Sequence, residues 1–344
     1  MSVSERTSSA PPPGSTSTPA LVASDLVKTY GKGDKAVHAL TGVSFTVAAG
    51  TVVGLLGPNG AGKSTTVKIL TTLSRADSGS ARVAGLDVDR QAAEVRRVIG
   101  YVPQQPCFDP MATGRENLVL QGRVHGLSAA ASRRRADDLL ERFSLAAAAG
   151  RLAGTWSGGM QRKLDVALGL THSPQVLFLD EPTTGLDPEA RADMWTEIER
   201  LTRTDGLSVL LTTHYLEEAD HLADQLVIVD RGAVVAAGSP HQLKGELDGD
   251  AVQVELESTD LAERARQTLL AASGAAEVTI DGRTVRTRLG AGSSALPGVL
   301  AALDAAGIAL ASVTVARPSL DDVYLRHAGR AFRAADEAAA KAVA

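Results

Sequence analysis

One stretch decides the fold class of this chain: Gly57-Pro58-Asn59-Gly60-Ala61-Gly62-Lys63-Ser64. It fits the pattern G-x-x-x-x-G-K-[ST], whose glycines let successive backbone N–H groups point inward around a phosphate. The apolar run Thr51–Leu56 before it predicts a strand, and the residues from Lys63 onward predict a helix. Because a helix N-terminus favours anions, the three parts together predict an α/β fold that binds a nucleotide phosphate.

Two side chains in this stretch point to ATP and Mg²⁺ as cofactors. In loops of this pattern the lysine, here Lys63, reaches the β- and γ-phosphates, and the hydroxyl of the next residue, Ser64, binds Mg²⁺. We expect Thr65 to complete the phosphate site. A glycine-rich turn with a purely structural role would not require the Lys-Ser pair.

A second apolar run ends in two carboxylates. Val176–Leu179 predicts a strand that is buried on both faces, and Asp180 and Glu181 follow it directly. Ligands of open α/β sheets bind at the carboxyl ends of the strands. Asp180 therefore suits the shell of Mg²⁺, and Glu181 suits a general base that orients and polarises the attacking water. Next to a phosphate-binding loop, the pair predicts an ATPase.

Strand-like and helix-like segments alternate along the first two thirds of the chain, which predicts a mostly parallel α/β core with some antiparallel edge strands. The other strands expected there are 23–30, 43–47, 207–212 and a hairpin of 226–230 with 233–237, and residues 112–150 are expected to form a helical insertion. A polar linker is expected at 244–250. Beyond it we expect strand 251–257, helix 259–272, strands 276–281 and 284–289, helix 293–306 and strand 309–316, which is the βαββαβ order of ferredoxin-like domains, and then a last helix from Ser319.

Composition and charge exclude several classes of protein. The chain has 344 residues, of which 44% are hydrophobic, and a net charge of −5, which argues against a general nucleic-acid-binding protein. Its single cysteine, Cys107, allows no disulfide within the chain and fits a reducing compartment. The sequence shows neither a signal peptide nor an apolar stretch of membrane-spanning length. We therefore expect contact with a membrane to be made through a partner.

Further segments resemble the ATP-binding subunits of ABC transporters. The resemblance covers about residues 21–245, and its motifs occur in the order that is found in that family. They are Tyr30, like the aromatic residue of the A-loop; Gln104 after Tyr101-Val102-Pro103, like the Q-loop; Trp156-Ser157-Gly158-Gly159-Met160, like the signature LSGGQ; Glu181–Pro188, like the catalytic glutamate and the D-loop; and Thr212-Thr213-His214, like the switch histidine.

The resemblance implies that the nucleotide joins two cassettes. Ser157, Gly158 and Gly159 would offer a hydroxyl, bare backbone amides and a helix N-terminus to the γ-phosphate that a second cassette binds. Asp187 is implied to align the two sites. The partners implied are a second cassette, which makes a homodimer, and an integral-membrane permease subunit.

The resemblance also implies roles for three single residues. Gln104 would bind Mg²⁺, sense the attacking water and relay its state to the membrane partner. His214 would contact the γ-phosphate, and Tyr30 would stack on the adenine through its π face. The catalytic set is thus expected to be Glu181, His214 and Gln104, and the Mg²⁺ ligands Ser64, Gln104 and Asp180.

The signature departs from the family pattern at Trp156, in place of Leu, and at Met160, in place of Gln. Neither replaced side chain is needed for the amide and hydroxyl contacts, so ATP hydrolysis should survive. Residues 156–165, 113–118 and 318–325 resemble the daunorubicin-resistance type of exporter ATPase. This likeness implies a separate membrane polypeptide, the export of a drug, hydrophobic natural product or lipid, and a peripheral location on the cytoplasmic side of the cell membrane.

The expected architecture has four parts: a disordered tail at 1–20, an ABC cassette at 21–245, a C-terminal accessory or dimerisation domain at 246–328, and an Ala-rich tail at 329–344. The cassette is implied to combine a RecA-like P-loop NTPase core, an antiparallel β subdomain and a helical signature subdomain. The second domain is a small α+β unit without a cluster of titratable residues typical of catalysis, and we expect it to serve dimer contacts or regulation.

Two other functions stay open at this point. A soluble ABC ATPase could act on ribosomes, DNA or cofactor assembly, but the ribosomal types carry two cassettes per chain, the DNA-repair types carry a long coiled coil, and neither feature is found in this sequence. An importer ATPase with a C-terminal regulatory domain would usually end its signature in Gln-Gln-Arg, which differs from Met160-Gln161-Arg162.

Overall fold

The computed structural model describes residues 18–247, 250–271, 275–289, 296–316, 318–332, 334 and 336. The tail expected at 1–20 therefore lies mostly outside the described residues, as do parts of the expected linker, of the helix 293–306 and of the Ala-rich tail. Ala20, which we had assigned to the tail, is buried, and its N–H donates to the carbonyl of Val47. The cassette thus includes Ala20, before the expected start at residue 21.

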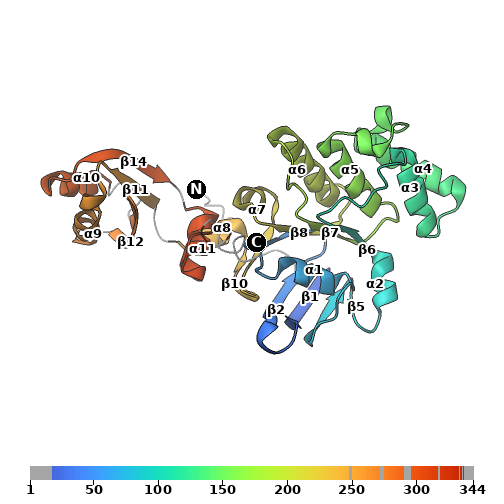
Figure 1. Ribbon diagram of the computed structural model, residues 1–344, viewed down its shortest axis with the longest axis horizontal. Coiled ribbons are helices and arrows are strands. Elements are labelled where there is room, and N and C mark those ends of the chain that lie inside the picture. The colour runs from blue at the N-terminus through green and yellow to red at the C-terminus, as the bar shows by residue number, and fades with distance from the viewer. Residues whose placement is uncertain are drawn as a thin grey trace, which may run out of the picture.

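A mostly parallel sheet forms the centre of the cassette, in the order β10-β9-β3-β8-β7-β6 (Figure 1). Its parallel strands are β3 (Val52–Leu56), β6 (Ile99–Val102), β7 (Val176–Asp180), β8 (Ser208–Thr213) and β9 (Gln225–Asp230), and β10 (Ala233–Gly238) pairs antiparallel with β9 at the edge. Every residue of β3, β7 and β8 is buried. This explains their continuous apolar runs and confirms the expected α/β core.

An antiparallel sheet packs beside the core, in the order β2-β1-β4-β5. Its strands are β1 (Leu21–Tyr30), β2 (Val37–Val47), β4 (Ser78–Val83) and β5 (Leu86–Asp87), and α1 (Lys63–Leu70) and α2 (Ala92–Val98) contribute to the same apolar core. The strand expected at 43–47 is longer than predicted, because β2 pairs along the whole of β1 through several register shifts. Such irregularities break the alternation of polar and apolar residues that identifies a strand.

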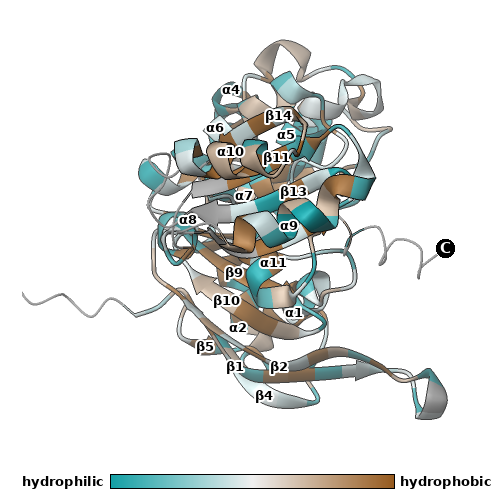
Figure 2. Ribbon diagram, turned by 90° about the vertical axis from the view of Figure 1, so that its left-hand side faces the viewer, coloured by the Kyte–Doolittle hydropathy of each residue, from teal (hydrophilic) through white to brown (hydrophobic). Residues whose placement is uncertain are grey.

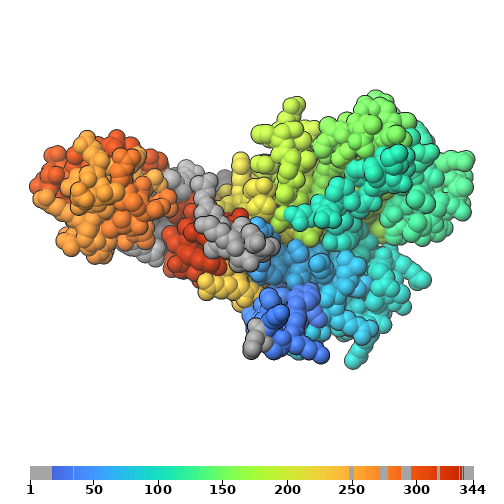
Figure 3. Space-filling model, in the orientation of Figure 1, coloured from blue at the N-terminus to red at the C-terminus, as the bar shows by residue number. Residues whose placement is uncertain are grey.

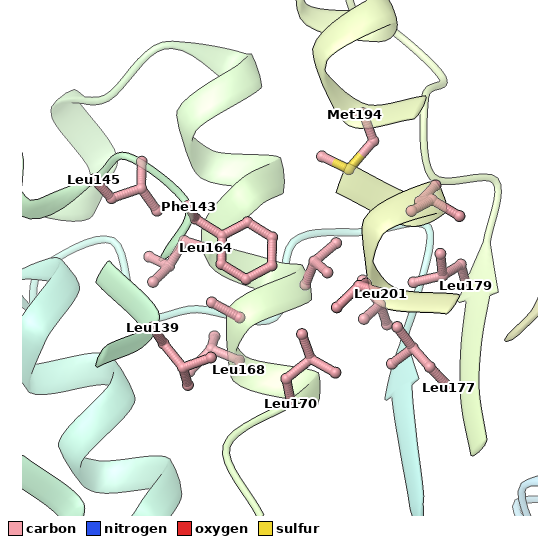
Figure 4. Close-up of a cluster of buried hydrophobic side chains, with 14 of the residues drawn as sticks. Leu139, Phe143, Leu145, Leu164, Leu168, Leu170, Leu177, Leu179, Met194 and Leu201 are labelled. Atoms are coloured by element: carbon pink, nitrogen blue, oxygen red, sulfur yellow. The ribbon is translucent and has the colours of Figure 1, made fainter. Parts of the chain in front are cut away.

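Four helices cover the other side of the core, in the green to yellow part of Figure 1: α3 (Gly114–Val124), α4 (Ala129–Arg142), α5 (Gly158–Gly169) and α6 (Pro188–Arg203). Figure 4 shows Leu139, Phe143 and Leu164 meeting Leu177 and Leu201 in one apolar cluster. The cluster ties the helical insertion to the central sheet through α5.

Trp156 and Gly114, from two segments that resemble the daunorubicin-resistance type of ATPase, pack directly on each other. A Cβ added to Gly114 would lie 2.2 Å from the Trp156 ring, which is buried. The large side chain at the start of the signature therefore requires glycine at the start of α3.

A third sheet forms the lobe at the left of Figures 1 and 3, in the order β12-β13-β11-β14. Its elements are β11 (Asp250–Leu256), α9 (Ala262–Ala271), β12 (Ala275–Asp281), β13 (Thr284–Leu289), α10 (Leu296–Ala305) and β14 (Leu310–Ala316). All described pairings are antiparallel, so the expected ferredoxin-like arrangement is confirmed. Apolar residues gather in β11 and β14, while α9 carries polar residues on its exposed side (Figure 2).

The last helix, α11 (Leu320–Ala328), returns from this lobe to the cassette. Its Tyr324 is fully buried in a cluster with residues of α8 (Pro240–Gly245), α7 (Leu216–Leu222) and β9. The Tyr324 hydroxyl donates to Asp230 Oδ1 at 3.0 Å, and Arg330 Nη2 donates to the same atom at 2.7 Å. The accessory domain expected at 246–328 includes α11, and in the structure this helix packs against the core of the cassette. The start that we expected for the linker is wrong, since Lys244 lies in α8.

Candidate active site

The phosphate-binding loop connects β3 to α1, as its pattern predicted. Gly62 caps α1 in the left-handed conformation, with φ of 109°, and a Cβ at this position would lie 2.6 Å from the carbonyl oxygen of Ala39. Only glycine fits a turn of this kind so close to another backbone. The loop therefore keeps its amides and the N-terminus of α1 turned toward one anion site.

Lys63 lies at the centre of this loop and is 4% exposed. Its Nζ donates to the carbonyls of Gly57 at 2.6 Å and Pro58 at 3.1 Å, and lies 3.9 Å from Glu181 Oε1. Burial lowers the pKa of Lys63, while the negative charges of Glu181, Asp336 and Asp180 oppose that shift. The ammonium is thus surrounded by acceptors, in a place where phosphate oxygens could replace the two carbonyls.

Ser64 and Asp180 face each other beside the loop. The Ser64 hydroxyl lies 3.4 Å from Asp180 Oδ1, and the same carboxylate oxygen accepts a 2.6 Å hydrogen bond from Thr212 Oγ1. A hydroxyl and a carboxylate are the hard oxygen ligands that Mg²⁺ takes from proteins when phosphate and water fill its remaining positions. Among the described residues no cluster of three or more acidic, His or Cys side chains forms a metal site. The pair fits a magnesium ion that binds together with nucleotide.

Glu181 is the point where the expected catalytic residues meet. Its Oε2 accepts hydrogen bonds from Gln104 Nε2 at 2.9 Å and Thr184 Oγ1 at 3.2 Å, and its Oε1 lies 3.2 Å from His214 Nδ1. The backbone of Glu181 is left-handed, with φ of 49°, and its N–H donates to Thr212 Oγ1 at 3.0 Å. A left-handed glutamate is strained, and such strain concentrates at functional sites.

The surroundings of Glu181 keep its carboxylate ionised although it is 8% exposed. Burial alone would raise the pKa of Glu181, but His214, Lys63 and the Thr184 hydroxyl outweigh burial and hold this pKa below its usual value. An ionised carboxylate that is fixed by neighbours on both oxygens can accept a hydrogen bond from a water molecule and polarise it.

Tyr30 and the signature lie apart from this cluster. Tyr30 ends β1 and is 41% exposed, with Lys28 Nζ 5.6 Å from the centre of its ring. Ser157 caps α5 and Asp187 caps α6, and both line a cavity of about 200 Å³ together with Gly159. In the described part of the chain, no hydrogen bond or ion pair joins these signature residues to the phosphate-binding loop. Gly158 is exposed beside Ser157.

Sequence reasoning missed two contributors to the site. Thr212 holds both Asp180 and Glu181, and its signal was available, because it opens the segment Thr212-Thr213-His214 that was noted for its histidine. Asp336 accepts a 3.0 Å hydrogen bond from the Asn59 N–H of the phosphate-binding loop. Nothing in the Ala-rich sequence around Asp336 predicted that this segment reaches the loop.

Comparison with known proteins supports the assignment of the fold and the chemistry. Residues 40–184 match the family model of the ABC transporter, and residues 238–328 match that of the ATP-binding protein DrrA1-3-like C-terminal domain. No helix in the described ranges has the length and apolar character needed to cross a membrane.

Two relatives resemble most of the chain. The doxorubicin resistance ATP-binding protein DrrA of Mycobacterium tuberculosis (strain CDC 1551 / Oshkosh) is 46% identical over 89% of this chain and 92% of its own length. The daunorubicin resistance ATP-binding protein DrrA3 of Streptomyces coeruleorubidus is 48% identical over 86% of this chain and 92% of its own.

A solved structure resembles the cassette. The dimeric, post-hydrolysis ATP-binding cassette MJ0796 bound to ADP and Pi matches with a TM-score of 0.58 and 27% identity, over 64% of this chain and 98% of that one. The chain belongs to the ABC transporter family, in the branch that carries a DrrA-like C-terminal domain, and is an ATP-hydrolysing subunit that powers an exporter.

Proposed function

We propose that two copies of this chain close on two molecules of MgATP, and that each copy supplies the signature residues for the nucleotide on the other. The observation that carries this proposal is the separation of two half-sites within one chain. Lys63, Glu181 and His214 gather at the phosphate-binding loop, whereas Ser157 and Asp187 line a different cavity. A nucleotide bound at the loop needs a second copy to meet a signature.

The chemistry proposed for each half-site follows from its contacts. The loop amides and Lys63 bind the phosphates, and Ser64 and Asp180 hold Mg²⁺, which would neutralise charge that develops on the phosphate oxygens. Glu181 accepts a hydrogen bond from the attacking water and holds that water in line with the γ-phosphate. Gln104 engages Glu181 through its amide nitrogen, which leaves the amide oxygen to face the metal ion or the water.

His214 and Tyr30 complete the proposed nucleotide contacts. His214 lies at the side of Glu181 that faces Lys63, where its ring would reach the γ-phosphate. Tyr30, exposed at the end of β1, would stack on the adenine. These roles agree with the relation of the chain to an ADP- and Pi-bound cassette dimer.

We further propose that the closing and opening of the dimer drives a separate integral-membrane permease, on the cytoplasmic side of the cell membrane. The proposed cargo is a drug, hydrophobic natural product or lipid. The names of the two resistance relatives supply the cargo class. ATP can drive the permease because the closed dimer binds ATP more tightly than the open one does.

Co-purification tests the transport part of the proposal. A tagged Glu181→Gln variant, trapped with MgATP in mild detergent from its native cell, should retain a stoichiometric integral-membrane protein. The Lys63→Ala variant, which should not bind nucleotide, serves as the control for trapping. Recovery of ribosomes or of soluble proteins alone would contradict a transporter subunit and would leave the nucleotide chemistry intact.

A further inference from the structure

A buried ion pair on the signature helix has no part in the nucleotide contacts described above. Arg162 and Asp165 lie one turn apart on α5, 3.7 Å from each other, and are 8% and 2% exposed. Burial lowers the pKa of Arg162 and raises that of Asp165, so each charge is costly here unless its neighbours compensate for the lost water.

The Arg162 guanidinium is compensated by backbone carbonyls from two separate segments. Its Nη1 donates to Pro103 at 2.7 Å, directly before Gln104. Its Nη2 donates to Asp180 at 3.0 Å and Glu181 at 3.3 Å, and its Nε to Pro182 at 2.9 Å. One planar side chain thus joins the segment that carries Gln104 to the segment that carries the catalytic carboxylate.

Asp165 holds the same Gln104 segment from its other end. Its Oδ1 accepts hydrogen bonds from the N–H of Cys107 at 3.0 Å and from the thiol of Cys107 at 3.1 Å. The residues between Pro103 and Cys107 are therefore fixed on both sides by one helical turn of α5. Gln104 lies inside this short span and donates to Glu181 Oε2 at 2.9 Å.

We propose that Arg162 and Asp165 are positioning residues for ATP hydrolysis, which together form a clamp that sets Gln104 against Glu181. The clamp fixes both partners of the Gln104–Glu181 hydrogen bond, one through the Pro103–Cys107 span and the other through the backbone of Asp180–Pro182. Since Ser157 caps the N-terminus of the same helix, a shift of the signature would move this clamp with it. The clamp itself concerns the ATPase of the chain, and its link to the signature rests on the proposed dimer.

The clamp requires arginine in particular. Four carbonyl oxygens in two segments match the rigid fork of a guanidinium, whereas a lysine ammonium is a single point on a flexible stem. An Arg162→Lys substitution keeps the positive charge beside Asp165 and loses the bridge between the two segments.

The chain offers a matched control for this substitution. Arg135 of α4 also donates to two backbone carbonyls, those of Leu170 at 2.7 Å and Thr171 at 3.2 Å, beyond the far end of α5. Arg135→Lys removes comparable arginine–carbonyl contacts just beyond the other end of α5 but touches neither Gln104 nor Glu181. A purely structural role of Arg162 would make the two variants alike.

The first experiment compares Arg162→Lys with Arg135→Lys in the full-length chain, in purified protein and in native membranes. We expect Arg162→Lys to lower kcat on the order of 10-fold or more and to change the ATP Kd by less than about 3-fold, because the phosphate-binding loop is untouched. Arg135→Lys should lower Tm by a similar amount and leave kcat within about 2-fold of wild type. Equal kcat values in the two variants would overturn the proposal.

A second experiment tests the part of the clamp that Asp165 forms. Its result can be interpreted even if the Arg162→Lys variant does not fold. Asp165→Ala should lower kcat about 10-fold in the wild-type chain but less than about 2-fold in a Gln104→Ala chain, since both changes act on one contact. Asp165→Asn, whose amide oxygen can still accept from Cys107, should restore most of the activity. The same loss in both backgrounds would refute a role through Gln104. The turnover of the wild-type chain is measured in every experiment. If the wild-type chain did not hydrolyse ATP, that result would be distinguished from a failure of the clamp proposal.

Discussion

The two lobes of this molecule are both built on β-sheets, yet they differ in what lies at the sheet edges. At the carboxyl ends of β3, β7 and β8, buried charged groups converge: Lys63, Asp180 and Glu181 are all less than 9% exposed. The C-terminal sheet instead packs α9 and α10 on an apolar core formed by Val252, Val254, Leu269, Leu303 and their neighbours. Buried charged side chains that need stabilising neighbours are typical of an active site, and they occur in the cassette. The C-terminal lobe has an apolar core instead, which is typical of a structural or regulatory domain.

The sharpest test of this contrast is the loss of one carboxylate. Glu181→Gln keeps the shape of the side chain but removes the charge that polarises water, so kcat should fall about 10²- to 10⁴-fold. ATP binding, measured by fluorescence titration, should stay within a few-fold of wild type. Turnover close to that of wild type would remove Glu181 as the base.

A second test removes the ammonium from the phosphate-binding loop. Lys63→Ala should weaken MgATP binding about 10- to 100-fold, as expected for the loss of charge-assisted hydrogen bonds to phosphate. Lys68→Ala, on the exposed side of the same helix, is the matched control and should leave Kd unchanged. Unaltered affinity in the Lys63 variant would disprove the assignment of the loop. Calorimetry measures both values.

The boundary between the lobes can be tested at α11. Tyr324→Phe removes the hydroxyl that donates to Asp230, and should lower the free energy of unfolding of the cassette by about 1 kcal/mol. Chemical denaturation followed by intrinsic fluorescence measures this change. If α11 instead belonged energetically to the C-terminal lobe, the cassette transition would not move and the transition of that lobe would.

The smallest effect concerns the contact of Asp336 with the phosphate-binding loop. The Asp336 carboxylate accepts a hydrogen bond from the Asn59 N–H and lies near Lys63. It therefore competes with a phosphate for the Asn59 amide and for the charge of Lys63. Asp336→Ala should therefore tighten ATP binding by about 2- to 3-fold. Asp336→Asn should show part of this effect through the loss of charge. Weaker ATP binding in either variant would mean that the contact assists the nucleotide.

The features that could be predicted from the sequence are those carried by residues close together in the chain. The phosphate-binding loop, the Asp180-Glu181 pair and the signature are contiguous in the chain, so their chemistry shows in short stretches. The ferredoxin-like order could be predicted because its periodicity is local. The roles of Arg162, Asp165 and Asp336 could not be predicted, since they arise from contacts with backbone groups that are distant in sequence. Nothing in the sequence around Arg162 indicates that its side chain donates to the carbonyls of Pro103 and Pro182.

The contact of α11 with the cassette could not be predicted for a related reason. The helix follows the C-terminal sheet in the chain, and sequence order suggested that it belonged there. Its amphipathic pattern predicted a buried face but did not predict what covers it. In the structure that face meets Leu56, Ala219 and Ile228 of the cassette, and Tyr324 finds its hydrogen-bond partner on β9.

The central claim is that two chains share each nucleotide, and the mass of the trapped protein tests it most directly. Analytical ultracentrifugation of Glu181→Gln with MgATP should give a dimer that holds two nucleotides. Adding Ser157→Arg, which places a bulky cation where the γ-phosphate of the other copy should lie, should return the protein to a monomer that still binds ATP. A monomer in the first case, or a dimer that Ser157→Arg leaves intact, would contradict the shared site.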